Sequence, residues 1–218
     1  MITLSPNVPS EYRDDLLQAA LQRPASGIPT SEWAAVIGGI VSRETAYASS
    51  PHSWGQALRP RGPSGAGDPA KRWKVNPPDW AVLTGQTRIG TSGVQQEYGP
   101  PQVPGFDGRG FGMGLGQVDL ETSGESWDYF TGGEWAKPLE AFKRVAETIA
   151  AQLDTFGDLR DAVAAYNHGA SSVQARLNSG RAVDWPDQAG GDYATDALQR
   201  AALYGLDPSR ISSPSGNS

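Results

Sequence analysis

The sequence contains no cysteine among its 218 residues, so disulfide frameworks and thiolate metal sites are excluded. It also lacks an apolar run long enough to span a membrane. The N-terminus has neither the basic region nor the apolar stretch of a signal peptide. We therefore expect no membrane span and no visible signal peptide. The chain would then stay where it is made, leave by another route or by lysis, or have a leader that lies outside this sequence.

Basic residues are few compared with acidic ones. Lys and Arg total 18 and Asp and Glu total 24, which gives a formal net charge of −6. Proteins that bind nucleic acid usually carry a basic patch or stripe that neutralises phosphates. We therefore expect no nucleic-acid partner.

Glycine and proline, by contrast, are abundant. The 27 Gly and 17 Pro residues together form about a fifth of the chain, so much of it must be loop. The length suffices for one domain with a sizeable core, or for a domain with one large insertion.

Hydrophobic periodicity predicts five helical stretches, and no internal repeat is visible. In these stretches apolar residues recur every three or four positions, which is typical of a helix that buries one face. The predicted stretches are residues 10–22, 30–45, 137–156, 158–168 and 192–204.

The ends and faces of these stretches follow from individual residues. Thr30 or Ser31 can cap the second stretch, and Gly169 and Gly205 should end the fourth and fifth. The apolar side of the first stretch is expected to consist of Leu16, Leu17, Ala20 and Leu21, and that of the second of Trp33, Ile37, Ile40 and Val41.

A long Gly/Pro-rich region separates the second and third predicted helices. A structureless loop of this length is rare inside a compact domain, so short strands, an Ω-type insertion or both are expected. Its Trp54, Trp73, Trp80 and Tyr98 offer flat apolar faces that could pack on the domain body or on a ligand. At the other end of the chain, the polar residues 207–218 are expected to form a disordered tail.

Glu44 ends an apolar helix and is the first candidate for chemistry. Desolvation and the partial negative charge of a helix C-terminus both raise the pKa of a carboxyl group. A carboxyl that stays protonated near neutral pH is what a general acid requires. The alternative is a surface glutamate paired with Arg43 or with another basic residue.

The second candidate is a glycine-rich segment with glycine at every second position from 108 to 116. In an extended chain these glycines share one side, which allows a ligand or another backbone to approach closely. Asp107 and Asp119 bracket the run and could add carboxylates to a cleft. A phosphate-binding loop is a weak alternative because no Lys-Ser/Thr pair follows. The apolar flanking residues also disfavour a flexible linker.

Two further segments contain polar residues at helix ends. Tyr166 and Asn167 precede Gly169, where their side chains could line a site or form an ordinary helix C-cap. Tyr193 lies at the start of the last predicted helix, in Asp192-Tyr193-Ala194-Thr195-Asp196-Ala197. This last segment alone indicates only an amphipathic helix.

The four segments together resemble the goose-type lysozymes and the related lytic transglycosylases of the lysozyme-like superfamily. The family pattern is Ser-Arg-Glu-Ser, Gly-Leu-Met-Gln-Val-Asp, Ala-Tyr-Asn-Ala-Gly and Asp-Tyr-Ala-x-Asp-Val, in that order. The chain contains Ser42-Arg43-Glu44-Thr45, Gly114-Leu115-Gly116-Gln117-Val118-Asp119, Ala165-Tyr166-Asn167-His168-Gly169 and the segment from Asp192 to Ala197. The resemblance covers roughly residues 10–48 and 105–205.

The resemblance implies a role for each matching residue. Glu44 corresponds to the general acid that cleaves the β-1,4 bond between N-acetylmuramic acid and N-acetylglucosamine in peptidoglycan. Asp119 and Asp107 correspond to the aspartates that hold the attacking water in an inverting hydrolase. The residues implied to bind substrate are Gln117, Tyr166, Asn167 and Tyr193. The resemblance implies no metal and no cofactor.

The resemblance also implies a fold. We expect a mainly α (α+β) protein, with one lysozyme-like helical domain over residues 1–206 and a small β-hairpin beside the cleft. Residues 49–104 would form a long Gly/Pro-rich insertion, since the stretch between Glu44 and Asp107 is far longer than in compact goose-type enzymes. Asp107 aligns only if one glycine is inserted before Gly110, so Asp119 is the better match.

The expected protein is thus a monomeric muramidase that acts on the bacterial cell wall, outside the cell, in the periplasm or delivered by a phage. Its net negative charge does not favour approach to an anionic wall. The alternatives are a lytic transglycosylase, which releases a 1,6-anhydro product, and a catalytically weak cell-wall-binding module. Phage lysin, virion part and injected effector all remain open as biological settings.

Overall fold

The computed structural model describes residues 4–46, 112–113, 115–116, 118–119, 137–183, 185 and 192–211. The chain divides into two compact units, one formed by residues 1–55 and 142–218 and the other by residues 56–141. The expected single domain over residues 1–206, with an insertion at 49–104, stays a prediction. The predicted aromatic contacts of Trp54, Trp73, Trp80 and Tyr98 lie outside the described residues.

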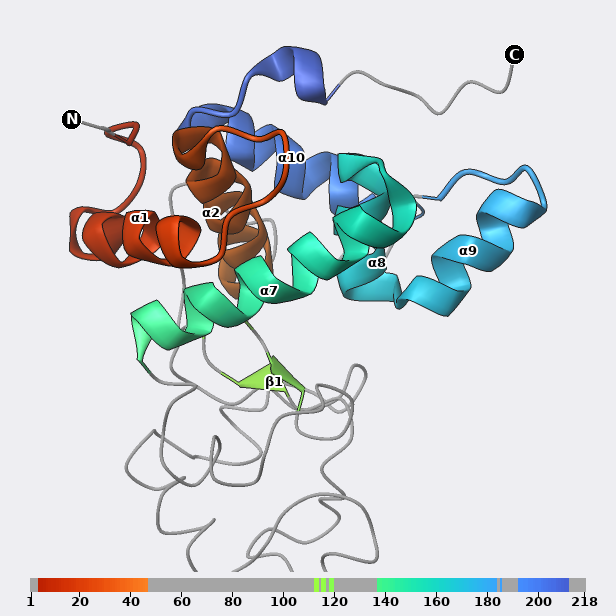
Figure 1. Ribbon diagram of the computed structural model, residues 1–218, viewed down its shortest axis with the longest axis horizontal. Helices are drawn as coiled ribbons and strands as arrows, with labels where there is room; N and C mark the ends of the chain where they lie inside the picture. The colour runs from red at the N-terminus through yellow and green to blue at the C-terminus, as the bar shows by residue number, and fades with distance from the viewer. Residues whose placement is uncertain are drawn as a thin grey trace, which may run out of the picture. The chain divides into compact units, whose positions relative to one another are not determined.

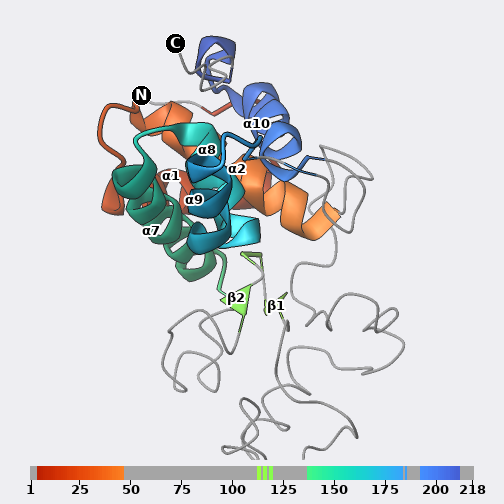
Figure 2. The same ribbon diagram turned by 90° about the vertical axis from the view of Figure 1, so that its right-hand side faces the viewer.

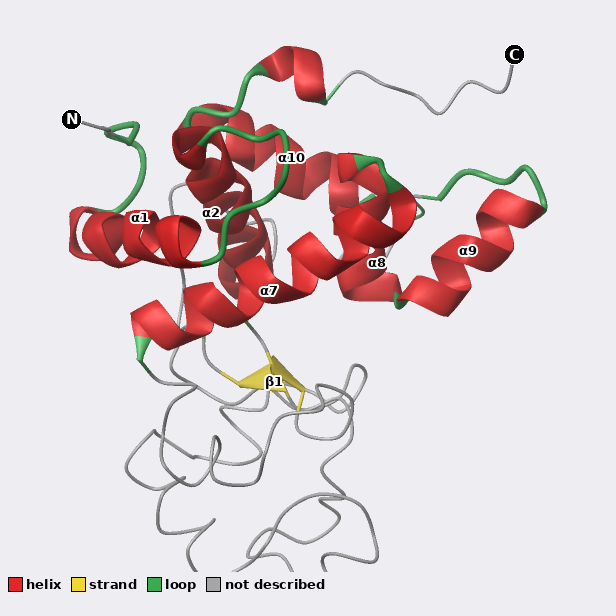
Figure 3. Ribbon diagram, in the orientation of Figure 1, coloured by secondary structure: helices red, strands yellow, loops and turns green. Residues whose placement is uncertain are grey.

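The described part of the chain is mainly helical, as the sequence predicted (Figures 1 and 3). Its helices are η1 (Ser10–Tyr12), α1 (Arg13–Gln22), α2 (Thr30–Ala46), α7 (Pro138–Phe156), α8 (Leu159–His168), α9 (Ala170–Asn178), α10 (Tyr193–Tyr204) and η3 (Pro208–Arg210). Two short strands, β1 (Gly112–Met113) and β2 (Val118–Asp119), pair antiparallel with Gly112 opposite Asp119.

Helix α2 is the centre of the helical unit. Every residue from 33 to 43 is buried, whereas the sequence pattern predicted only one apolar side. A helix that is apolar all round is typical of a core position. Helix α2 packs against α1 and α10, and the two views in Figures 1 and 2 agree on this arrangement.

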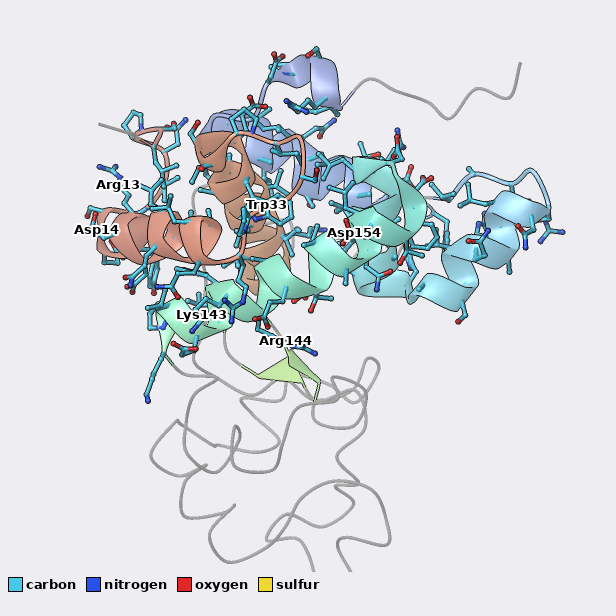
Figure 4. All side chains as sticks on the ribbon, in the orientation of Figure 1. Arg13, Asp14, Trp33, Lys143, Arg144 and Asp154 are labelled. Atoms are coloured by element: carbon cyan, nitrogen blue, oxygen red, sulfur yellow. The ribbon has the colours of Figure 1, made fainter. Side chains whose placement is uncertain are left out.

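Helix α2 also begins slightly earlier than its predicted cap. The Trp33 amide donates to the Pro29 carbonyl at 2.8 Å, so the capping position is Pro29 and not Thr30 or Ser31. The Trp33 indole N–H donates to the Arg23 carbonyl at 2.7 Å and is thereby satisfied inside the core. Figure 4 shows Trp33 inside the helical unit and Arg13 at its periphery.

Helix α2 approaches α10 closely because three small residues meet there. A Cβ atom added at Gly39 would lie 2.4 Å from the Ala197 carbonyl oxygen and 2.9 Å from the Ala201 Cβ. Only glycine fits against the α10 backbone at this distance. This contact sets the distance between the helices that carry Glu44 and Tyr193.

Local signals account for several helix boundaries. The Asp158 carboxylate accepts from the Arg160 and Asp161 amides at 2.8 and 3.1 Å, and so caps α8. Gly169 and Gly205 follow α8 and α10 with φ of +81° and +117°, as predicted for residues that end a helix.

Three expectations about the helices were wrong. Helix α9 was not predicted, because its only buried residue is Val173 and its sequence has no apolar stripe. Leu21, expected on the buried side of α1, is 59% exposed. The predicted disordered tail begins too early, because residues 208–210 form η3 and Arg210 Nε lies 2.7 Å from Glu32 Oε2. Residues 212–218 lie outside the described part.

Candidate functional site

Glu44 lies in the last turn of α2 and is half-buried. The ten residues before it are all buried, so the helix presents its C-terminal end and this carboxylate together at the edge of the core. A charged side chain at such a position loses part of its hydration, and partners in the protein must replace it.

Tyr193 supplies one of these partners. It is the first residue of α10 and is only 2% exposed, and its hydroxyl donates a hydrogen bond to Glu44 Oε1. The two residues are 149 positions apart in the chain. The structure therefore brings together two candidate residues that the sequence selected from separate motifs.

The Tyr193 hydroxyl stays protonated over a wide pH range. Burial raises its pKa well above the ordinary value of 10.0, and the neighbouring Glu44 carboxylate raises it further. The Tyr166 side chain contributes in the same direction, whereas Arg43 opposes the rise. Tyr193 is therefore a donor to Glu44 at neutral and mildly alkaline pH, because its pKa is well above 10.0.

Aromatic and cationic groups surround the Tyr193 ring. The Arg43 guanidinium carbon lies 5.7 Å from the ring centroid, and the His168 ring packs against it at 6.4 Å in an edge arrangement. His168 in turn stacks on Trp185 with centroids 3.7 Å apart, and Arg176 lies 4.3 Å from the Trp185 ring centroid. The Tyr193 ring is therefore in contact with Arg43 of α2 and with His168, the last residue of α8.

Sequence reasoning missed this surrounding group. Trp185 belongs to none of the four motifs, and His168 stands where the family pattern has alanine. Arg43 was considered only as a surface partner of Glu44, whereas it is 3% exposed and pairs with Asp196 Oδ2 at 3.0 Å. Arg43 follows an apolar run in the sequence, and an arginine there is a signal that could have pointed to this pair, because a charge taken out of water requires a partner.

Of the other predicted site residues, the structure describes the side chains of Tyr166 and Asn167 only. Tyr166 is half-buried and interacts electrostatically with Tyr193, while Asn167 is exposed and its Nδ2 lies 3.3 Å from His168 Nδ1. Asp119 lies in β2, but its side chain is outside the described part of the structure. The predictions for Asp107 and Gln117 also fall outside the described residues.

No protein-family model matches this chain, and neither a curated protein nor a solved structure is significantly similar to it. Within the described ranges, no group of three or more His, Asp or Glu side chains could hold a metal ion. None of the helices in those ranges has the length and apolar character needed to cross a membrane.

The raised pKa of Tyr193 leads to a test of this site at alkaline pH. The protonated phenol contributes stability that is complete below pH 10 and is lost as the pH rises through its folded-state pKa. We expect Tyr193→Phe to reduce the loss of stability between about pH 10 and pH 12, the range above the ordinary tyrosine pKa. Denaturant unfolding at a series of pH values measures this slope.

Tyr12→Phe is the matched control, because the pKa of Tyr12 is also raised by burial but its side chain is only half-buried. Its effect on the alkaline slope should be smaller. Equal slopes for wild type and Tyr193→Phe would show that the hydroxyl is not buried against Glu44.

Proposed function

We propose that this chain is an N-acetylmuramidase that hydrolyses the β-1,4 bond between N-acetylmuramic acid and N-acetylglucosamine in bacterial peptidoglycan. The observation that carries the proposal is the hydrogen bond from Tyr193 to Glu44. It joins the two helix motifs that resemble those of goose-type lysozymes, at a half-buried carboxyl group on the edge of the core.

Glu44 is the general acid in this proposal. Oε1 accepts from Tyr193, so a proton on the carboxyl group resides on Oε2, from which it passes to the glycosidic oxygen. Tyr193 stays protonated and fixes the rotation of the carboxyl group through the reaction. Orientation of this kind lowers the entropic part of the barrier.

Asp119 and Asp107 are the proposed carboxylates that hold the attacking water. One protonated carboxyl and one ionised carboxylate, with a water between them, produce hydrolysis with inversion. Gln117, Tyr166 and Asn167 are proposed to contact the glycan strand.

The chemical ends of the released glycan fragments show which reaction has taken place. Purified peptidoglycan is digested and the soluble fragments are analysed by mass spectrometry. New reducing ends at N-acetylmuramic acid support the muramidase, whereas 1,6-anhydro ends would identify a lytic transglycosylase. The absence of fragments, together with retained binding to the polymer, would identify a cell-wall-binding module.

The two aspartates are expected to differ in importance. Asp119→Asn should slow hydrolysis more than Asp107→Asn, because Asp119 lies in an unbroken motif and Asp107 aligns only with an inserted glycine. Initial rates of fragment release by the purified, folded variants measure the difference. The reverse ranking would contradict the alignment of this segment, and a switch to anhydro product in either variant would support its water-holding role.

A further inference from the structure

A network of charged and polar residues joins α10 to the two residues of α2 that precede Glu44. Arg200 Nε lies 3.1 Å from both oxygens of Asp196, one helical turn earlier in α10. The same guanidinium reaches across to α2, where its terminal nitrogen donates to Ser42 Oγ at 3.0 Å. Arg43 of α2 completes the network through its 3.0 Å ion pair with Asp196. We call these four residues the α2–α10 clamp.

Three of the four clamp residues are almost fully buried. Ser42, Arg43 and Arg200 are each at most 3% exposed, and the Asp196 side chain is 28% exposed. Breaking a buried pair by removing one partner is strongly destabilising, but replacing the whole set with apolar residues is often neutral or better. Stability alone therefore does not account for four polar groups in this position.

The clamp fixes the position of α2 relative to α10. Ser42 and Arg43 immediately precede Glu44 in α2, and Asp196 lies one turn after Tyr193 in α10. The planar guanidinium of Arg200 holds both a carboxylate and a hydroxyl in defined directions, which a point charge does not do. Sliding or rotation of one helix against the other breaks these contacts together with the Glu44–Tyr193 hydrogen bond.

We infer that Asp196 is a positioning residue for Glu44, acting through the α2–α10 clamp to hold the Glu44 carboxyl against the Tyr193 hydroxyl. Asp196 joins both arginines, so its loss releases both helices from the clamp. The kinetic part of this inference rests on the proposed muramidase activity, whereas the geometric part does not.

The test compares Asp196→Asn, Arg200→Lys and a control, Glu147→Gln, in the full-length protein. Glu147 pairs with Arg23 on the surface of the helical unit, so the control removes a carboxylate–arginine pair outside the clamp. On purified peptidoglycan, Asp196→Asn should lower kcat by about 10²-fold with KM unchanged, the size of loss that small misplacements cause. Arg200→Lys keeps the positive charge but loses the planar guanidinium that contacts Asp196 and Ser42 together. It should lower kcat in the same way to a smaller degree.

A double-mutant comparison with Tyr193 distinguishes a loss of positioning from a general loss of structure. When Asp196→Asn is combined with Tyr193→Phe, the loss in kcat should be smaller than the product of the single losses, because both act on the same carboxyl group. The Tyr193 hydroxyl proton, assigned by its absence in Tyr193→Phe, supplies a second readout by proton NMR. Its resonance should shift in Asp196→Asn and Arg200→Lys and stay in place in Glu147→Gln.

An unmoved hydroxyl resonance in both clamp variants, or an unchanged kcat in folded Asp196→Asn, would overturn the inference. If Asp196→Asn does not fold, Arg200→Lys decides the question through the same two measurements. If the wild-type protein cleaves no glycan, the proposed function fails, and the NMR measurement still tests the clamp by itself.

Discussion

Glu44→Gln is expected to lower the rate of peptidoglycan cleavage by at least about 100-fold, because general acid catalysis typically supplies ~10²–10⁴-fold. Glutamine keeps the shape of the side chain, and its carbonyl oxygen can still accept from the Tyr193 hydroxyl. It has no proton to give to a leaving oxygen. Binding of chito-oligosaccharides, measured by calorimetry, should therefore stay close to that of the wild type.

Glu11→Gln is the matched control for this experiment. Glu11 lies in η1, is exposed, and undergoes the same change of side chain outside the site. The control should cleave peptidoglycan at the wild-type rate. Activity of Glu44→Gln above about a hundredth of wild type would remove Glu44 from the acid role.

Gly39→Ala is expected to have the largest effect on stability. Alanine is ordinarily about 1 kcal/mol better than glycine inside a helix, so a gain would be expected on propensity alone. Here the added Cβ meets the α10 backbone at 2.4 and 2.8 Å, and backbone atoms move only with the whole helix. Overpacking typically costs 1–3 kcal/mol, and a contact with backbone atoms is expected at the upper end of this range, which leaves a net loss of about 2 kcal/mol after the gain in helix propensity.

This loss corresponds to a fall in Tm of roughly 4–8 °C for a protein of this size, measurable by circular dichroism. The variant should also lose kcat beyond its loss of stability, because α2 and α10 carry Glu44 and Tyr193. Gly157→Ala separates the two effects. Gly157 has a φ of +70° with open space around it, so alanine there strains the backbone without moving α2 against α10. Equal activity in the two variants would contradict a link between helix spacing and the site.

The helices of the described region were largely predictable because their signals are local. The apolar spacing of α7 and the glycines after α8 and α10 act within a few residues, so the sequence shows them directly. The burial of residues 33–43 of α2 on all sides was not predictable in this way. It depends on α1 and α10 packing around the helix, and nothing in residues 30–46 alone states which neighbours will cover it.

In the candidate site, too, residues that belong to a local motif were predictable, whereas contacts between residues far apart in the sequence were not. Glu44 and Tyr193 were found because their motifs occur in a characteristic order, and the structure brings these two residues together. The clamp was missed because it pairs residues far apart in the sequence, such as Ser42 and Arg200. The stack of Trp185 on His168 was missed because Trp185 belongs to no motif. Non-local pairs of this kind follow from the packing of α2 on α10 and of α8 on α9, which no local pattern encodes.

Hydrolysis by external water with the help of Glu44 is the central step of the proposed function. Digestion of purified peptidoglycan in ¹⁸O-labelled water, followed by mass spectrometry of the fragments, tests this most directly. Wild-type protein should place one labelled oxygen at C1 of the new N-acetylmuramic acid end, and Glu44→Gln digested in parallel should release almost no labelled fragment. Unlabelled anhydro ends, absence of cleavage by the wild type, or equal labelling by the variant would contradict hydrolysis with Glu44 as the general acid.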